Sequence, residues 1–126
     1  MNFEQNTPLD EILTALFLPY KKNVPDVEKI TSAMVSARLI QNEDEIINDH
    51  IAFRTLGVPN LGIASFEKIF LHYGYIKKDA YHFSEKKLNA YWYAPPSDDY
   101  PRIFLSELRV QDLSDNAQRI IKKYTA

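Results

Sequence analysis

The spacing of apolar residues changes from helical to alternating near residue 46. Before that point apolar residues recur three and four positions apart, which predicts two helices. We expect Pro19 to limit how far the first helix runs, because a proline in a helix interior removes a hydrogen bond. Pro25 is expected to begin the second helix. Residues 42–45, three of which are acidic, predict a solvated loop after it.

Alternation begins with a predicted strand over residues 46–56. Because neighbouring side chains on a strand point to opposite faces, this strand should carry two different rows. One row is mainly apolar and the other carries a histidine and an arginine. The two rows are Ile51, Phe53 and Thr55 on one face, and His50, Ala52 and Arg54 on the other.

The remainder of the chain predicts a helix, three strands and a last helix. Residues 57–62 form a loop, Ser65 is expected to cap the helix that follows, and Gly74 to end it. The predicted strands cover 75–83, 88–94 and 102–110, and the last helix opens at 112–115. The predicted fold class is α+β in a single compact domain. Its parts are N-terminal helices (1–45), a β-α-β-β-β module (46–110) and a C-terminal helix (111–126).

Composition narrows the possible functions. The chain has 126 residues, a formal net charge of −2, no cysteine and three glycines. The near-neutral charge argues against nucleic acid or an acidic membrane surface as partner. The sequence has no disulfide, thiolate metal site, glycine-rich phosphate loop or nucleophile elbow. No apolar run approaches the roughly 20 residues that span a bilayer, and the N-terminus lacks signal-peptide features. We expect a cytoplasmic protein.

His50 and Arg54 are the strongest candidates for chemistry. They lie on the same face of the predicted strand, about 13 Å apart at the backbone, with the small Ala52 between them. A neutral imidazole can bind a divalent metal, and a guanidinium can grip a carboxylate through two parallel hydrogen bonds. The alternative is structural, with His50 a surface or hydrogen-bonded histidine and Arg54 paired with Asp49 or Glu107.

Glu107 is a second candidate metal ligand. It lies on the last predicted strand, on the same face as Ile103 and Leu105. A carboxylate among apolar neighbours must be paired, protonated or bound to a metal. We expect Glu107 to face the same cavity as His50. The alternative is a salt bridge to a nearby arginine.

Four stretches of the sequence resemble one known family. They are Asn-Asp-His-Ile-Ala-Phe-Arg-Thr (48–55), Gly-Ile-Ala-Ser-Phe (62–66), Lys-Leu-Asn-Ala-Tyr-Trp-Tyr-Ala-Pro-Pro (87–96) and Pro-Arg-Ile-Phe-Leu-Ser-Glu-Leu (101–108). Together they resemble the 2-oxoadipate dioxygenase/decarboxylase family, which includes bacterial lysine-catabolic enzymes and plant plastid relatives. The resemblance spans most of residues 8–125. It implies a glyoxalase-like fold of the vicinal-oxygen-chelate superfamily, in which two β-α-β-β-β modules form a cupped sheet around a metal.

The resemblance also implies a chemistry. Family members use O2 to convert 2-oxoadipate into 2-hydroxyglutarate with loss of CO2, at an Fe(II) held by two His and one Glu. By resemblance, His50 would be the first of these ligands and Arg54 would bind a substrate carboxylate. Such a ligand set leaves three positions on the iron for a 2-oxo acid and O2. Glu107 is not matched to the family's glutamate ligand.

The length of this chain leaves three hypotheses for its function. Family members are considerably longer, and their other ligands lie in the downstream half. The chain is therefore the N-terminal portion of such an enzyme, a non-catalytic half-module for a small acid or metal that pairs with a second copy, or a structural fragment. We expect a second module or a homodimer partner to complete the site. The expected small-molecule partners are a 2-oxo acid and O2, with no nucleic acid or membrane.

Overall fold

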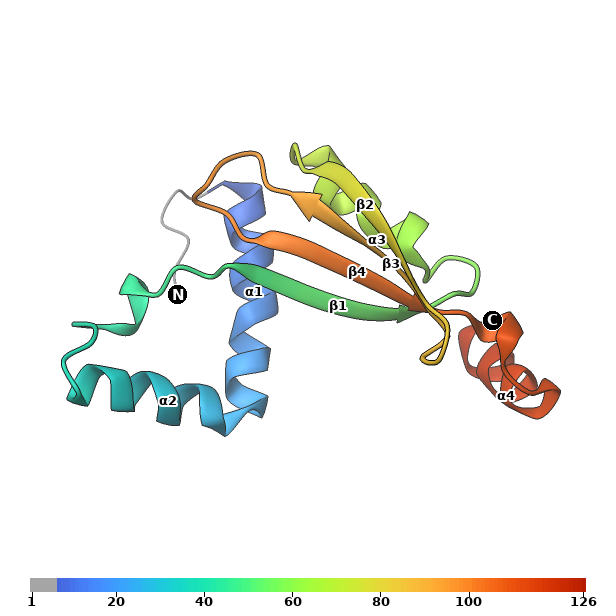
Figure 1. Cartoon of the computed structure of the whole chain (residues 1–126), viewed down its shortest axis with the longest axis horizontal. Coiled ribbons are helices and arrows are strands. Elements are labelled where there is room, and N and C mark those ends of the chain that lie inside the picture. Colours follow the sequence, from blue (N-terminus) through green and yellow to red (C-terminus); the bar gives the residue numbers. More distant parts are fainter. Residues whose placement is uncertain (1–6) are drawn as a thin grey trace. The chain divides into compact units, whose positions relative to one another are not determined.

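The computed structural model describes residues 7–126, and these contain four α-helices and a four-stranded sheet (Figure 1). The chain divides into two units, residues 1–48 and 49–126, where the sequence predicted one domain. The second unit holds the β-α-β-β-β module together with the C-terminal helix, which the sequence had set apart as a separate segment.

The first unit contains the two predicted N-terminal helices, α1 (Pro8–Asn23) and α2 (Pro25–Ser36). Thr7 and Asp10 form a reciprocal capping box at the start of α1. Pro19 lies inside this helix, which continues past the proline to Asn23. Its ring forfeits one hydrogen bond to the carbonyl of Ala15, and both residues are exposed, so water can satisfy that carbonyl.

The second unit is built on a sheet with the order β1-β4-β3-β2. β1 runs parallel to β4, and the other neighbouring strands are antiparallel. The strand prediction over residues 46–56 began too early. His50 pairs with Arg102, the first residue of β4, and in the described part of the chain no strand lies beside residues 46–49. The bounds are β1 (His50–Leu56), β2 (Ile76–Phe83), β3 (Leu88–Ala94) and β4 (Arg102–Leu108).

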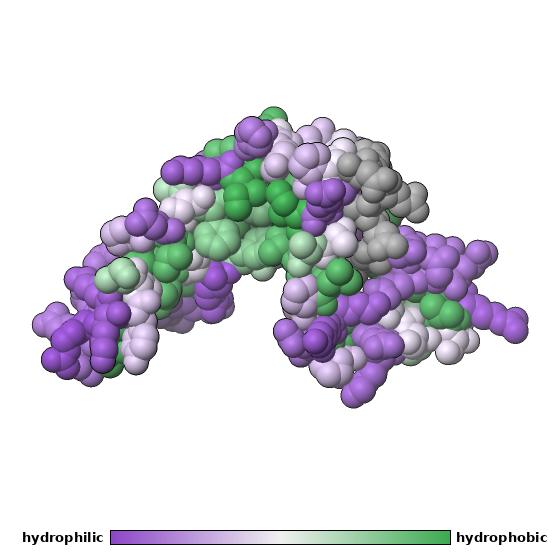
Figure 2. Space-filling view, turned by 180° about the vertical axis from the view of Figure 1, so that it is seen from behind, coloured by the Kyte–Doolittle hydropathy of each residue, from purple (hydrophilic) through white to green (hydrophobic). Residues whose placement is uncertain are grey.

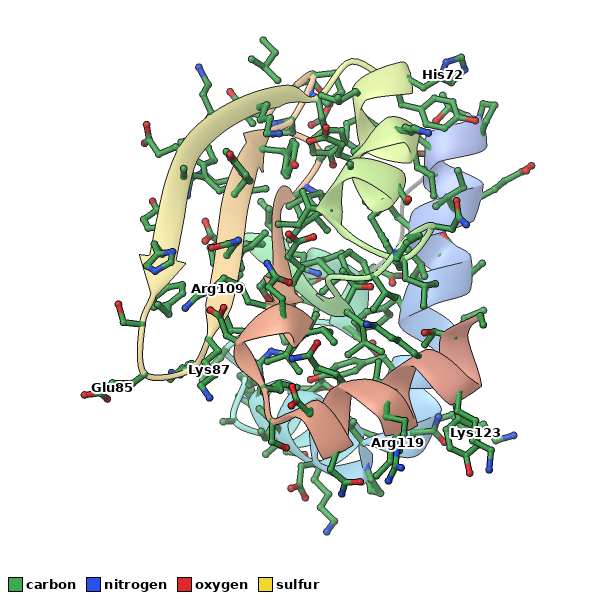
Figure 3. The ribbon with its side chains drawn as sticks, turned by 90° about the vertical axis from the view of Figure 1, so that its right-hand side faces the viewer. His72, Glu85, Lys87, Arg109, Arg119 and Lys123 are labelled. Atoms are coloured by element: carbon green, nitrogen blue, oxygen red, sulfur yellow. The ribbon has the colours of Figure 1, made fainter. Side chains whose placement is uncertain are left out.

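One face of the sheet is packed against α3 (Ile63–His72) (Figures 1 and 3). Ile103, Leu105 and Tyr93 are fully buried on this face. The Phe70 ring lies 5.9 Å from that of Phe53 and 5.5 Å from that of Tyr75, centroid to centroid. The apolar row of β1 therefore faces the core, and the predicted division of β1 into two rows is confirmed.

The two ends of α3 are set by different means. Gly74 follows the helix with φ +92°, a conformation that favours glycine, so the predicted stop is confirmed. The predicted Ser65 cap is wrong, because α3 begins at Ile63 with Gly62 as its N-cap and no capping side chain of its own. α4 (Asp115–Thr125) is capped by Ser114, and the surface that it contributes is mostly hydrophilic (Figure 2).

Candidate functional site

The sheet face opposite α3 carries a hollow of about 670 Å³. Such a volume is in the usual range for small-molecule sites. His50 and Ala52 of β1 line it, as do Arg102 and Phe104 of β4 and Trp92 of β3. Parallel pairing places His50 beside Arg102, and Ala52 beside Phe104. Asp79 and Tyr81 of β2 also line the hollow, so side chains from all four strands surround it.

The structure places His50 and Arg54 on one face, as the sequence predicted. Both side chains are exposed, and His50 lies in the hollow with a 63% exposed side chain. Arg54 lines a separate hollow of about 560 Å³ together with Lys86 and Leu88. Neither of the carboxylates proposed as structural partners pairs with Arg54, and within residues 7–126 its guanidinium forms no ion pair. The guanidinium is therefore available for an anion.

Asp49 lies directly before β1 and contacts two residues of the site. Its Oδ2 is 3.2 Å from Nδ1 of His50, and its Oδ1 accepts a hydrogen bond from Nη1 of Arg102 at 3.4 Å. The backbone N–H of Arg102 also donates to the Asp49 carbonyl at 3.0 Å. Asp49 was considered from sequence only as a partner for Arg54, because the pairing of β1 with β4 that brings it to Arg102 is not visible in the sequence.

Glu107 does not share a cavity with His50, which corrects the expectation from sequence. It pairs with Thr55 in the β1–β4 register, on the α3 side of the sheet. Its Oε2 accepts a hydrogen bond from the backbone N–H of Ile63 at 2.8 Å. A carboxylate is favourable at this position because the N-terminus of a helix carries partial positive charge. Glu107 supplies the cap that α3 lacks in its own sequence.

An aromatic wall on the open face was not identified as part of the site from sequence. The Tyr81 ring is stacked on Phe83 at 6.3 Å and lies 5.9 Å from the Phe104 ring. The indole N–H of Trp92 donates to Asp79 at 3.2 Å. Asp79 reaches this position from a β-bulge, since three residue steps of β2 oppose two of β3 between Lys77 and Ala80.

A second polar cluster lies on the α3 side of the sheet. The Tyr93 hydroxyl donates to Oε2 of Glu67 at 2.6 Å, and Nζ of Lys77 is 2.9 Å from the same oxygen. Burial tends to raise the pKa of Glu67, but these two hydrogen bonds outweigh it and leave the pKa below its ordinary value. Burial and the Glu67 contact raise the pKa of Tyr93. The cluster ties α3 to β2 and β3.

Arg109 stabilises the end of the sheet at the β2–β3 turn, where it lies near Lys87 (Figure 3). Its nearly buried guanidinium donates to the carbonyl of Leu88 at 2.9 Å and to the carboxylate of Asp112 at 2.6 Å. All of these partners belong to the protein, so Arg109 supports the fold and is not free to bind an anion.

The described residues offer one metal ligand of the implied set. Within residues 7–126 no group of three or more His, Cys, Asp or Glu side chains could hold a metal ion. His50 fits the role of a single ligand, because its ring lies in the hollow and the Asp49 contact at Nδ1 leaves Nε2 for a metal. Over the same residues, no helix is long and apolar enough to cross a membrane.

Residues 12–126 match the family model described as 2-oxoadipate dioxygenase/decarboxylase. A rice protein named 2-oxoadipate dioxygenase/decarboxylase, chloroplastic/amyloplastic, is 44% identical over 91 residues, which is 64% of this chain and 25% of the rice protein. The crystal structure of rice hydroxyglutarate synthase in complex with 2-oxoadipate superposes with a TM-score of 0.81 at 35% identity, over 90% of this chain and 38% of that one.

A glyoxalase-superfamily protein from Ralstonia eutropha superposes with a TM-score of 0.75 at 21% identity, over 88% of this chain and 35% of that one. This match shows a shared fold and confirms the predicted α+β, glyoxalase-like architecture. The chain spans about a quarter of the curated rice relative.

Proposed function

Because this chain belongs to the 2-oxoadipate dioxygenase/decarboxylase family, we propose that its sheet provides the N-terminal part of a site that binds Fe(II) and a 2-oxo dicarboxylic acid. The observation that carries the proposal is the row His50, Ala52 and Arg54 on the uncovered face of β1, within the matched residues. The same row is exposed while the opposite face of the strand packs against α3.

His50 and Arg54 would hold opposite ends of the substrate complex. The imidazole of His50 would contribute one ligand to Fe(II), which when bound would activate O2 for the oxidative decarboxylation of 2-oxoadipate to 2-hydroxyglutarate and CO2. The guanidinium of Arg54 would bind the distal carboxylate through charge-assisted hydrogen bonds. About 13 Å of backbone separates the two residues, which leaves room for a dicarboxylate between the side chains.

The other residues of the hollow would orient the substrate and exclude water. Ala52 leaves space between the two polar side chains. The Phe104 and Tyr81 rings would contact the methylene groups of the substrate, since apolar side chains lining a pocket bury apolar ligand surface. Arg102 pairs with Asp49, so its charge is already partly neutralised and Arg54 is the better carboxylate ligand.

The remaining metal ligands would come from a second module, because the described residues contain no complete set. This module could be a continuation of the polypeptide or a second copy of the chain. In the second case the chain would be a half-module that binds a small acid or a metal without turnover. A cytoplasmic location and a role in lysine degradation stay predictions.

The test replaces the corresponding segment of the rice relative with residues 12–126 and measures O2 consumption with Fe(II) and 2-oxoadipate. We expect the chimera to consume O2, and His50→Ala to abolish the activity. His72→Ala is the matched control, because His72 lies exposed on α3, away from the hollow. A folded, active chimera in which His50→Ala keeps the parental rate would remove His50 from the site.

The role of Arg54 has its own measurement in the same chimera. Losing hydrogen bonds to a charged group costs about 1.5–3 kcal/mol. Arg54→Ala should therefore raise the KM or Kd for 2-oxoadipate roughly tenfold to a hundredfold. 2-Oxohexanoate lacks the distal carboxylate, so its affinity should change little. Equal losses for the two acids would contradict distal binding by Arg54.

The half-module alternative is distinguished by sedimentation of the 126-residue chain with and without Fe(II) and 2-oxoadipate. Ligand-dependent dimerisation that is lost in His50→Ala would favour pairing between two copies. A monomer at all ligand concentrations would favour completion of the site by a continuing polypeptide.

A further inference from the structure

Three side chains form a chain of contacts at the edge of the hollow: Arg102, Asp49 and His50. The carboxylate of Asp49 lies between the other two, with Oδ1 3.4 Å from Nη1 of Arg102 and Oδ2 3.2 Å from Nδ1 of His50. All three residues line the hollow. The proposed function assigns a metal to His50 but gives no role to Asp49 or Arg102.

Strand pairing fixes where Asp49 can be. The backbone N–H of Arg102 donates to the Asp49 carbonyl at 3.0 Å, and His50 pairs with Arg102 in the parallel register. Asp49 is thus tied at its backbone and at its side chain to the first residue of β4. Its Oδ2 is held on the side of the His50 ring, even though the side chain is exposed.

The contact with a carboxylate has a definite consequence for the imidazole. An ionised carboxylate can only accept hydrogen bonds, so Nδ1 of His50 must be the donor. A neutral ring with its proton on Nδ1 presents the Nε2 lone pair to the hollow. Metal-binding histidines commonly donate their other ring N–H to a carboxylate, which fixes the tautomer and ring orientation and raises the basicity of the ligand.

We propose that Asp49 is a positioning residue for His50: it holds the proton on Nδ1 and thereby presents Nε2 as the metal-binding atom, while Arg102 holds Asp49 in place. The inference rests on the proposed role of His50 as a metal ligand. Its central claim, the tautomer, is a property of the protein without metal or substrate and can be measured independently of that role.

The experiment is long-range ¹H–¹⁵N NMR on the ¹⁵N-labelled 126-residue chain at about pH 8, above the ordinary His pKa of about 6.5. We expect His50 to be predominantly the Nδ1–H tautomer, whereas exposed His72 should show the Nε2–H tautomer that free histidine prefers. In Asp49→Ala, His50 should shift toward the Nε2–H form. Asp49→Asn keeps an oxygen acceptor and should preserve much of the bias.

Zn²⁺ titration of the rice chimera carrying the same substitutions, in which the second module would complete the ligand set, gives a second readout. Loss of a carboxylate that supports a metal-binding histidine typically costs 10–100-fold in affinity, so Asp49→Ala should weaken Zn²⁺ binding at His50 by about that factor. Asp99→Ala, in the exposed loop before β4, is the matched control and should leave both the tautomer and the affinity unchanged.

The inference is overturned if His50 in the parent chain is the Nε2–H tautomer. It is also overturned if Asp49→Ala leaves the tautomer and the Zn²⁺ affinity of His50 unchanged. These results are distinct from failure of the proposed function: a chimera that does not respond to His50→Ala would refute the catalytic assignment while a biased tautomer would still establish the Asp49 contact.

Discussion

Substitution of Glu107 tests directly whether this carboxylate serves the fold or a metal. α3 has no capping side chain of its own, and Oε2 of Glu107 accepts from the Ile63 N–H at 2.8 Å. The carboxylate also fills the space beside Gly62, where an added Cβ would come within 2.6 Å of Oε2. We therefore expect Glu107→Ala to destabilise the protein by loosening the start of α3.

The magnitude follows from the contacts that are lost. Removing a capping side chain costs about 0.5–2 kcal/mol, and a negative charge at a helix N-terminus contributes about 0.3–1 kcal/mol, or up to about 2 when partly buried. Both figures describe the same contact and so are not summed. We expect about 1–2 kcal/mol for Glu107→Ala, and about 0.3–1 kcal/mol for Glu107→Gln, which keeps an oxygen acceptor but loses the charge.

The assay is urea unfolding followed by circular dichroism, with Glu85→Ala as control. Glu85 is exposed in the turn between β2 and β3 (Figure 3), and such surface substitutions usually stay within about 0.5 kcal/mol. The 2-oxoadipate affinity of the folded chimera should be unchanged in Glu107→Gln. If the Glu107 variants kept the parental stability but lost metal or 2-oxoadipate binding, the capping role would be refuted and Glu107 would again be a candidate metal ligand.

Three further predictions concern the packing that supports the sheet. Tyr93→Phe removes the hydrogen bond to the largely buried Glu67 and should cost about 1.5 kcal/mol or more in urea unfolding. The pKa of Glu67 is lower in the folded chain than its ordinary value of 4.5, so its contribution to stability is present above that pH and is lost as the pH falls through the folded pKa. In Lys77→Met, the urea midpoint should therefore fall less steeply as the pH is lowered. An unchanged pH dependence would contradict the role of Lys77 in lowering the pKa of Glu67. Gly74→Ala should cost about 1–2 kcal/mol because Gly74 has φ +92°, and a change below about 0.3 kcal/mol would show that the turn can relax.

Periodicity was sufficient to predict the order of elements but not where they begin. The strand β3 and the end of α3 at Gly74 were predicted correctly, because alternation and a glycine stop are local features of the sequence. β1 was predicted to begin at residue 46, yet a strand lasts only as long as it has a neighbour, and β4 starts opposite His50. The cap of α3 comes from Glu107, 44 residues away. No local pattern could identify it.

The misplacement of Glu107 could have been avoided from the sequence itself. Glu107 shares a face of its strand with Ile103 and Leu105, and the apolar row of the first strand contains Ile51 and Phe53. Strands of one sheet that is covered on a single face bury their apolar rows on that face, whether or not they are neighbours. Glu107 must then lie opposite His50 whatever the register. Asp49 and Asp79 are different cases, because a strand pairing and a β-bulge bring them to the site.

The charges of the open face explain why one arginine is the better candidate for the substrate. Arg102 and His50 share the carboxylate of Asp49, and Asp79 accepts from Trp92. Arg54 stands at the other end of the β1 row and, over the described residues, has no ion-pair partner. A guanidinium on an exposed face is solvated by water and needs no ion-pair partner. If a second module covered this face, the guanidinium would lose that water and would need a partner. A dicarboxylate held at its other end near His50 would supply that partner, so closing the site without substrate would leave Arg54 unpaired and should be disfavoured.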